Sequence, residues 1–195
     1  MNHSFQIMPK TELFNRDEVL DKCIQLFHEK GYNATSMQDL VDATGLNRSS
    51  LYNSFGSKMN IFQESLKVYK AKSADMVHSC LLDSKTPKSA LEAIFLFAVS
   101  DTKNGCLLSN CTTEMANQDY QLKRFLESNS TEMESIFERI VNKGQLEGSM
   151  NYKRTAKEYA TYLFSSLQGL RITGMLDNDI NKLKGIVKTT LSILN

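Results

Sequence analysis

Apolar residues recur along most of this chain every three or four positions, which is the spacing of one face of an α-helix. The first such stripe covers residues 16–30 and ends at Gly31, because glycine suits a helix stop. Gly144 and Gly148 are predicted to end the long helix that begins near residue 119. Gly174 is predicted to lie between the last two helices. No stretch alternates with period two over any length, so we expect an all-α fold. The remaining predicted helices cover about 58–82, 87–99, 105–116, 119–142, 152–173 and 180–194.

Residues 35–58 have the pattern of two short helices joined by a tight turn. The first helix follows a Thr-Ser pair that can act as N-cap and ends at Gly45, which adopts a left-handed conformation at no steric cost. Asn47 can cap the second helix, which runs to about residue 53 and points Leu51 and Phe55 inward. Its outward side chains are short or hydrogen-bonding, with no acid among them. This chemistry is typical of a helix that lies in a DNA groove.

The candidate DNA contacts fall into two kinds. Arg48 can donate two hydrogen bonds to a guanine edge, and Asn53 or Gln38 can read adenine. Better placed against phosphates, which fix the register of the protein but carry no sequence information, are Tyr52, Ser50, Thr35, Ser36 and Lys58. The alternative is that these side chains form the solvated face of an ordinary small helical bundle. The complete candidate set is Thr35, Ser36, Gln38, Asn47, Arg48, Ser49, Ser50, Tyr52, Asn53 and Lys58.

Three successive motifs, FHEKGYNATS, QDLVDATGLN and LYNSFGSK, lie within residues 16–69, and a helix follows the last of them. In this combination they resemble the DNA-binding region of the TetR family of bacterial transcriptional regulators. The resemblance implies a three-helix helix-turn-helix head, expected over 11–58 after a short N-terminal arm. It also implies a larger helical effector-binding and dimerisation domain, expected over 59–195. A homodimer of this kind binds a palindromic double-stranded operator, and a small effector releases it by moving the fourth helix and changing the separation of the two heads. Repression is the expected outcome, and activation stays open.

Charge and composition agree with this interpretation and exclude several classes. The net charge is only +1, yet residues 45–72 carry five basic side chains against one acid, a local excess that can attract DNA. The N-terminal sequence has no signal-peptide pattern and no apolar run is long enough to span a bilayer, so we expect a cytoplasmic protein without membrane contact. Four cysteines without a CxxC pair and three scattered histidines predict neither a metal site nor a cofactor.

An enzyme is the main rival class, and no motif supports it. The chain contains no GxSxG, no glycine-rich phosphate loop and no HExxH. A helical enzyme without a recognisable motif would show turnover without DNA binding, whereas the regulator would show salt-sensitive binding to a palindromic duplex. We therefore expect a regulator and not an enzyme.

The resemblance places an effector cavity among the middle helices. Aromatic and methionine side chains there can line it, and Gln168 and Arg171 can orient a ligand because they are polar within an apolar stretch. The alternative for each apolar residue is ordinary core packing, and for Arg171 a surface ion pair. The candidate ligand-binding residues are Phe97, Cys106, Met115, Met133, Phe137, Gln168, Arg171 and Met175.

Cys106 supports a second hypothesis, a regulator that senses oxidants or electrophiles through a thiol. It follows Gly105 at a predicted helix N-terminus, where free amides and the helix dipole stabilise a thiolate. Cys111 lies about 140° around the same helix, so a local disulfide is not expected. The alternative is simple packing against the cavity wall.

The last two helices carry apolar stripes that predict a dimer interface. Two protomers would pair these helices into a four-helix bundle, and small residues within the stripe permit close approach. The candidate interface residues are Tyr159, Tyr162, Leu163, Ser166, Leu167, Leu170, Leu183 and Val187.

Overall fold

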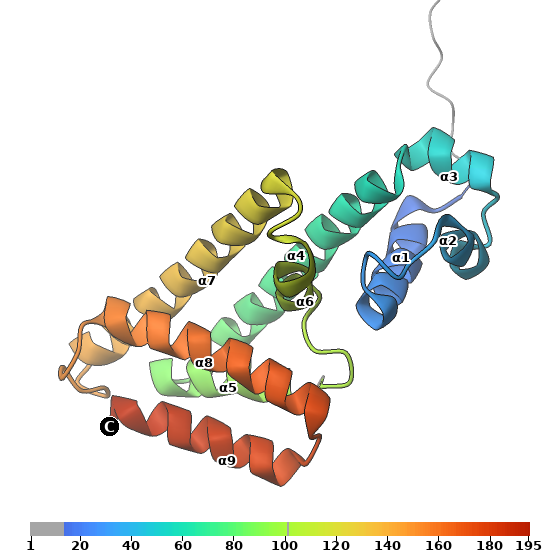
Figure 1. The fold of residues 1–195 in the computed structure, drawn as a ribbon. Helices are drawn as coiled ribbons and strands as arrows, with labels where there is room; N and C mark the ends of the chain where they lie inside the picture. The colour runs from blue at the N-terminus through green and yellow to red at the C-terminus, as the bar shows by residue number, and fades with distance from the viewer. Residues whose placement is uncertain (1–13, 101) are drawn as a thin grey trace, which may run out of the picture.

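The computed structural model describes residues 14–100 and 102–195, and all regular structure within them is helical (Figure 1). The predicted N-terminal arm and the first residues of the predicted head, 11–13, lie outside the described residues. The elements are α1 (Arg16–Lys30), α2 (Met37–Thr44), α3 (Arg48–Phe55), α4 (Lys58–Asp83), α5 (Pro87–Ser100), α6 (Leu107–Met115), α7 (Tyr120–Leu146), α8 (Ala156–Leu176), α9 (Ile180–Leu191) and the short 3₁₀ turn Ser192–Leu194.

Side-chain caps set the beginnings of most helices. Ser36 and Asp39 form a capping box at α2, each side chain bonding to the other residue's backbone N–H. Thr155 and Glu158 form a second box at α8. This box explains why α8 begins at Ala156 and not at the predicted residue 152, because the first-turn amides find their acceptors only there.

Two helices continue through glycines that were predicted to end or separate them. Gly144 lies inside α7, where an added Cβ would come 2.5 Å from the Met150 sulfur. Gly174 lies inside α8, where a Cβ would come 2.7 Å from a Thr102 methyl carbon. Both glycines are therefore sites of close packing, and Gly148, with φ of +72°, follows the end of α7.

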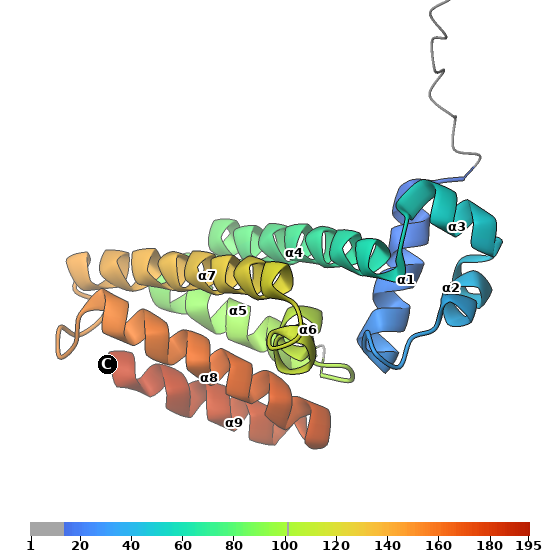
Figure 2. The ribbon, with the colours of Figure 1, turned by 45° about the horizontal axis from the view of Figure 1, so that its top comes forward.

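The buried side chains form two separate clusters. The body core lies among α5, the second half of α7, α8 and α9, with part of α4 against it. The head core joins α1, α2, α3 and the first half of α4 with α6 and the start of α7. Figure 2 shows this arrangement: α6 sits at the end of the helical body that faces α1, and α4 runs from the head along the body beside α7. The two cores thus do not divide the chain at residue 58, because residues 106–126 complete the core of the head.

Candidate functional site

Helix α3 is held against the head by its two buried side chains, Leu51 and Phe55. The Arg16 guanidinium lies 4.1 Å from the centre of the Phe55 ring and donates a hydrogen bond to the Ser54 carbonyl. The same guanidinium forms a 2.7 Å ion pair with Glu64 of α4. Arg16 therefore ties the end of α3 to the first part of the long helix that leaves the head.

The opposite side of α3 is free for a partner. Arg48, Ser49, Tyr52 and Asn53 are exposed on it, and α3 itself carries no acidic residue. Gln38 of α2 lies beside this surface, since its amide oxygen accepts a 3.4 Å hydrogen bond from Arg48. The side chains predicted to read bases and several of those predicted to bind phosphate thus share one exposed face of the turn motif, and their contacts with DNA stay a prediction.

Two residues predicted to contact phosphate have other roles. Thr35 is 1% exposed and its hydroxyl donates to the Gly31 carbonyl, so its side chain cannot reach DNA. The Lys58 ammonium donates to the Tyr32 and Thr35 carbonyls at 2.9 and 2.8 Å and lies 4.2 Å from the centre of the Tyr32 ring. Sequence reasoning missed the role of Lys58 because its partners lie 26 and 23 positions earlier in the chain.

Two other members of the predicted set support the motif locally. Asn47 caps α3 by accepting from the Ser50 amide at 2.8 Å, and Ser36 caps α2. The first turn of any helix has backbone N–H groups without intrahelical partners, and such groups are suitable donors for phosphate oxygens. Their role in DNA binding stays a prediction.

Glu114 of α6 connects the body side of the molecule to the head. Its two carboxylate oxygens accept from the backbone N–H groups of Tyr32 and Asn33, at 2.9 and 2.7 Å. Nearby, the His28 ring N–H donates to the Gly105 carbonyl at 3.2 Å. No sequence pattern singles out Glu114, because its partners lie 82 and 81 positions earlier.

Cys106, directly before α6, lies in a buried polar cluster between the head and the body. Arg171 and Gln168 of α8 belong to this cluster, and the Gln168 amide oxygen accepts from the Ser109 hydroxyl at 2.9 Å and from Arg171 at 3.3 Å. Burial opposes ionisation of the Cys106 thiol, but the Arg171 guanidinium, the amide and hydroxyl of Ser109 and the Tyr69 hydroxyl outweigh it and lower the thiol pKa. These neighbours thus make the thiolate easier to form here than their absence would allow.

The other three cysteines have the opposite tendency. Burial raises the pKa of Cys23 to about 12, and burial with the charges of Glu114 and Asp119 raises that of Cys111 to about 12. Burial and the neighbouring Asp83 also raise the pKa of Cys80. All four thiols are free of disulfides. Cys106 is therefore distinguished by its surroundings, although its side chain is only 4% exposed.

The predicted ligand-binding residues do not surround one common space. Cys106, Gln168 and Arg171 share the polar cluster, and the Met175 sulfur lies against Gly105 beside it. Phe137 is fully buried in the body core with Met133 packed against that core, Met115 is buried in the head core, and Phe97 is 43% exposed. Of the eight, four converge near the start of α6 and four do not. The methionine and aromatic pattern could not separate cavity lining from ordinary core.

Most of the predicted dimer residues are already used inside the protomer. Six of them have no more than 5% of their surface exposed and pack in the body core: Tyr159, Leu163, Leu167, Leu170, Leu183 and Val187. These six side chains cannot form an interface, because their own protomer covers them. Tyr162 is 47% exposed and Ser166 is partly exposed.

Within the described residues no helix is both long and apolar enough to cross a membrane, and no three metal-binding side chains cluster.

Comparison with known sequences agrees with the geometry of the head. Residues 19–65 match the family described as "Bacterial regulatory proteins, tetR family". The chain is 30% identical over 191 residues to the HTH-type transcriptional repressor ComR of Escherichia coli, covering 94% of this chain and 90% of ComR. It is 28% identical over 194 residues to the uncharacterized HTH-type transcriptional regulator YezE of Bacillus subtilis, covering 96% of this chain and all of YezE.

Solved structures show the same fold. A cysteine mutant of the TetR family transcriptional regulator CifR, complexed with 26-bp double-stranded operator DNA, superposes with a TM-score of 0.84 at 21% identity, covering 96% of this chain and 100% of that one. The reduced form of E. coli NemR superposes with a TM-score of 0.83 at 14% identity, covering 92% and 96% of the two chains. With a helix-turn-helix head, an all-helical body and a full-length relative at 30% identity, the chain belongs to the TetR family of bacterial transcriptional regulators.

Proposed function

We propose that this regulator is a repressor that binds a palindromic operator as a homodimer and is released by a small effector. The observation that carries the proposal is the exposed face of α3, where Arg48, Ser49, Tyr52 and Asn53 stand together with no acidic residue on the helix. Some of its relatives, including ComR, are repressors, which supports repression over activation.

Release would act through the parts that join head and body. Helix α4 begins at Lys58 beside the reading motif and continues to Asp83 against the body core, so a tilt of α4 moves the head. Two heads must fit half-sites about 34–36 Å apart or a multiple of this spacing, so a small change in their separation lowers operator affinity. Glu114 adds a second connection, since α6 moves with the loop that it holds.

The dimer would use the face of α8 that points away from the body core. Tyr162, Ser165, Gly169, Ile172 and Leu176 are exposed and follow one another at steps of three and four residues, which places them on one stripe. Gly169 has open space where a Cβ would stand, and so does Gly185 on α9, so a partner helix can approach closely.

The first test measures binding of the full chain to a palindromic duplex and to a random duplex at several salt concentrations. We expect tighter, salt-sensitive binding to the palindrome. Arg48→Ala should cost roughly 1–3 kcal/mol at one base position and relax specificity there. If Arg48→Ala weakens binding to both duplexes equally, Arg48 contacts phosphate and does not read a base.

The second test addresses the dimer. Leu176→Glu should split it, because a carboxylate would be buried without a partner in the interface. Leu82→Glu is the matched control, since Leu82 is also an exposed leucine at 70%, but lies near the end of α4. Sedimentation showing an unchanged dimer for Leu176→Glu would exclude this stripe from the interface.

A second candidate function is thiol sensing through Cys106. The specific observation is that Cys106 alone among the four cysteines has surroundings that lower its thiol pKa, and that it lies where the head meets the body. An alkylating electrophile such as iodoacetamide would form a sulfur–carbon bond with the thiolate and release iodide. Because Cys106 is only 4% exposed, the added group would have to make room within the cluster, and it would push α6 away from α8.

Thiol labelling at neutral pH with mass mapping tests this candidate. We expect Cys106 to react before Cys23 and Cys111, and operator release to accompany its modification. Cys106→Ser should bind operator like the parent but no longer respond to the reagent. If labelling rates are equal, or the serine variant still responds, the sensor hypothesis is wrong and the body acts as a conventional receptor.

A further inference from the structure

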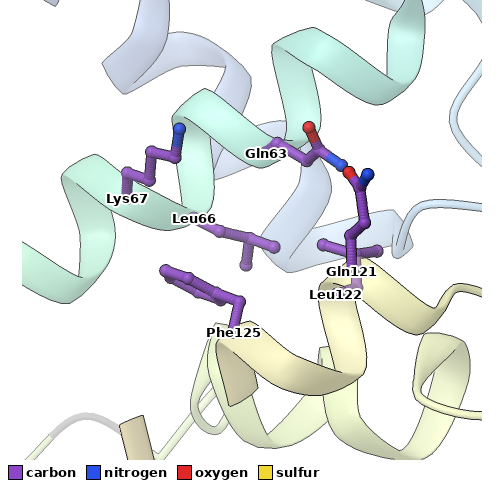
Figure 3. A pocket seen from close by; sticks show the side chains of 6 residues that line it. All are labelled: Gln63, Leu66, Lys67, Gln121, Leu122 and Phe125. Atoms are coloured by element: carbon purple, nitrogen blue, oxygen red, sulfur yellow. The ribbon is translucent and has the colours of Figure 1, made fainter. Parts of the chain in front are cut away.

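A pocket of about 160 Å³ lies between α4 and the start of α7, on the side of the body that meets the head. Leu66, Leu122 and Phe125 form its apolar floor, while Gln63, Lys67 and Gln121 surround it with polar groups (Figure 3). Leu66 and Leu122 have no more than 2% of their surface exposed and belong to the head core. The pocket therefore opens onto the core that positions the reading motif.

The polar groups around the pocket are available to a ligand, with Lys67 and Gln121 exposed to solvent and Gln63 half-buried. Gln63, Lys67 and Gln121 have no hydrogen-bonding or ion-pair partner for their side chains among the described residues. Figure 3 shows the two glutamine amides meeting at one end of the gap, with Lys67 one turn further along α4. Three unpartnered polar side chains over an apolar floor are the arrangement expected of a small-molecule site.

The charged side chains around the pocket indicate the charge of its ligand. The acidic side chains near it are already engaged: Glu64 pairs with Arg16, Glu132 with Lys70, and Asp119 caps α7 at the Leu122 amide. Lys67 is thus left as a positive charge without a counter-charge among the described residues. A bound carboxylate would supply that charge.

The volume and the apolar floor of the pocket suit a ligand with a single aromatic ring. An apolar cavity of about 150 Å³ accommodates benzene, so about 160 Å³ suits one aromatic ring with small substituents. The Phe125 ring and the two leucines would contact the ring of the ligand, and Phe125 already contacts a cation, since the Lys70 ammonium lies 5.6 Å from its centre. The two amides would bond to a polar substituent at the end away from the carboxylate.

We propose that this pocket binds a small aromatic carboxylate that carries a hydrogen-bonding group opposite the carboxylate, and that such a ligand lowers operator affinity by separating α4 from α7. Binding in the pocket does not depend on the proposed function, whereas its effect on the operator does. The pocket is distinct from the Cys106 cluster, because the two sets share no residue.

The test uses the full chain and three probes: 4-hydroxybenzoate, benzoate without the hydroxyl, and phenol without the carboxylate. Affinities are measured by ligand-observed NMR titration without DNA. We expect 4-hydroxybenzoate to bind with a Kd on the order of 1 mM, as suits a ligand of its size in a half-open site. Phe125→Ala should weaken all three probes, because it removes part of the floor.

Two further variants separate the polar contacts. Lys67→Met should weaken 4-hydroxybenzoate and benzoate by about threefold to fivefold, as expected for an exposed ion pair, and leave phenol unchanged. Gln121→Leu should weaken 4-hydroxybenzoate and phenol but not benzoate. The control is Lys85→Met, which removes the same charge from an exposed lysine outside the pocket.

Binding that is absent, or that Lys67→Met leaves unchanged for benzoate, would overturn the site. Operator titration with 4-hydroxybenzoate then tests the effect on DNA: we expect a lower operator affinity in the parent and a smaller decrease in Lys67→Met. Pocket binding with unchanged operator affinity would overturn the regulatory part of the proposal. Failure of the unliganded chain to prefer the palindrome would instead refute the proposed function, so the two failures are distinguishable.

Discussion

Removing the Glu114 carboxylate should loosen the head from the body without unfolding either. In the intact chain this group accepts two backbone hydrogen bonds, from Tyr32 and Asn33, in a loop that leads directly to α2. A hydrogen bond to a charged group contributes about 1.5–3 kcal/mol when buried. Glu114 is half-buried and the Asn33 contact is exposed, so we expect Glu114→Ala to cost about 2 kcal/mol in total.

Hydrogen exchange at the two amides measures this loss directly. A cost of about 2 kcal/mol in the local opening free energy corresponds to roughly thirtyfold faster exchange at Tyr32 and Asn33. Glu114→Gln should have a smaller effect, because its amide keeps one oxygen acceptor but sets an N–H₂ group against the other backbone donor. Operator affinity should fall in the same order, since a loosened head no longer has a fixed separation from its partner.

Glu127→Gln provides the matched control, because it removes the same charge from α7, where Lys123 lies 4.0 Å away. The reasoning would be refuted if the two amides exchanged no faster in Glu114→Ala than in Glu127→Gln. Equal acceleration of amides throughout the head would also count against it, because that result would indicate global destabilisation and not the loss of one connection.

Three further predictions concern other contacts. Lys58→Met should lower the free energy of unfolding by about 1–2 kcal/mol in urea titration, because it removes the hydrogen bonds to the loop and the contact with Tyr32. If stability is unchanged and the salt dependence of DNA binding falls by about one unit, Lys58 is a phosphate contact instead. Gly144→Ala should lower Tm, since its Cβ would meet three atoms of buried Met150 at 2.5–3.0 Å and overpacking outweighs the gain in helix propensity. The pH profile of Cys106 alkylation should have its midpoint at lower pH than that of an ordinary free thiol, because a lowered pKa extends the thiolate to lower pH. A midpoint unchanged by Arg171→Met would show that the guanidinium does not cause the lowering.

Sequence patterns were sufficient for the number and order of the helices in the described residues and for the exposed face of α3. The stripe of α1 predicted its bounds, and Asn47 predicted the beginning of α3, because caps and periodicity depend on residues close in the chain. The same local signals could not show that α7 continues through Gly144, since the reason is the approach of Met150 from the following loop. Local pattern therefore locates a helix better than it locates the end of one.

Which face of a helix meets which partner could not be predicted in the same way. Helix α8 has two stripes, and the more apolar one, containing Leu163 and Leu167, packs within the protomer. The stripe through Tyr162 and Gly169 mixes large, small and polar residues, and periodicity gives it no preference. Lys58 and Glu114 show the same restriction, because their partners in the loop before α2 are fixed only by the tertiary fold.

The shared core of the head and α6 limits how this regulator can be divided. A fragment that ends after residue 58 would lack Leu66, Cys111, Met115 and Leu122, which cover the inner faces of the first three helices. Such a fragment would expose apolar surface and fold poorly, and a chimera that exchanges only the first 58 residues would leave the same surfaces mismatched. A transplantable reading unit from this chain must therefore include two stretches, the N-terminal one and residues 106–126. Swapping experiments between relatives should treat the second stretch as part of the DNA-binding half of the molecule.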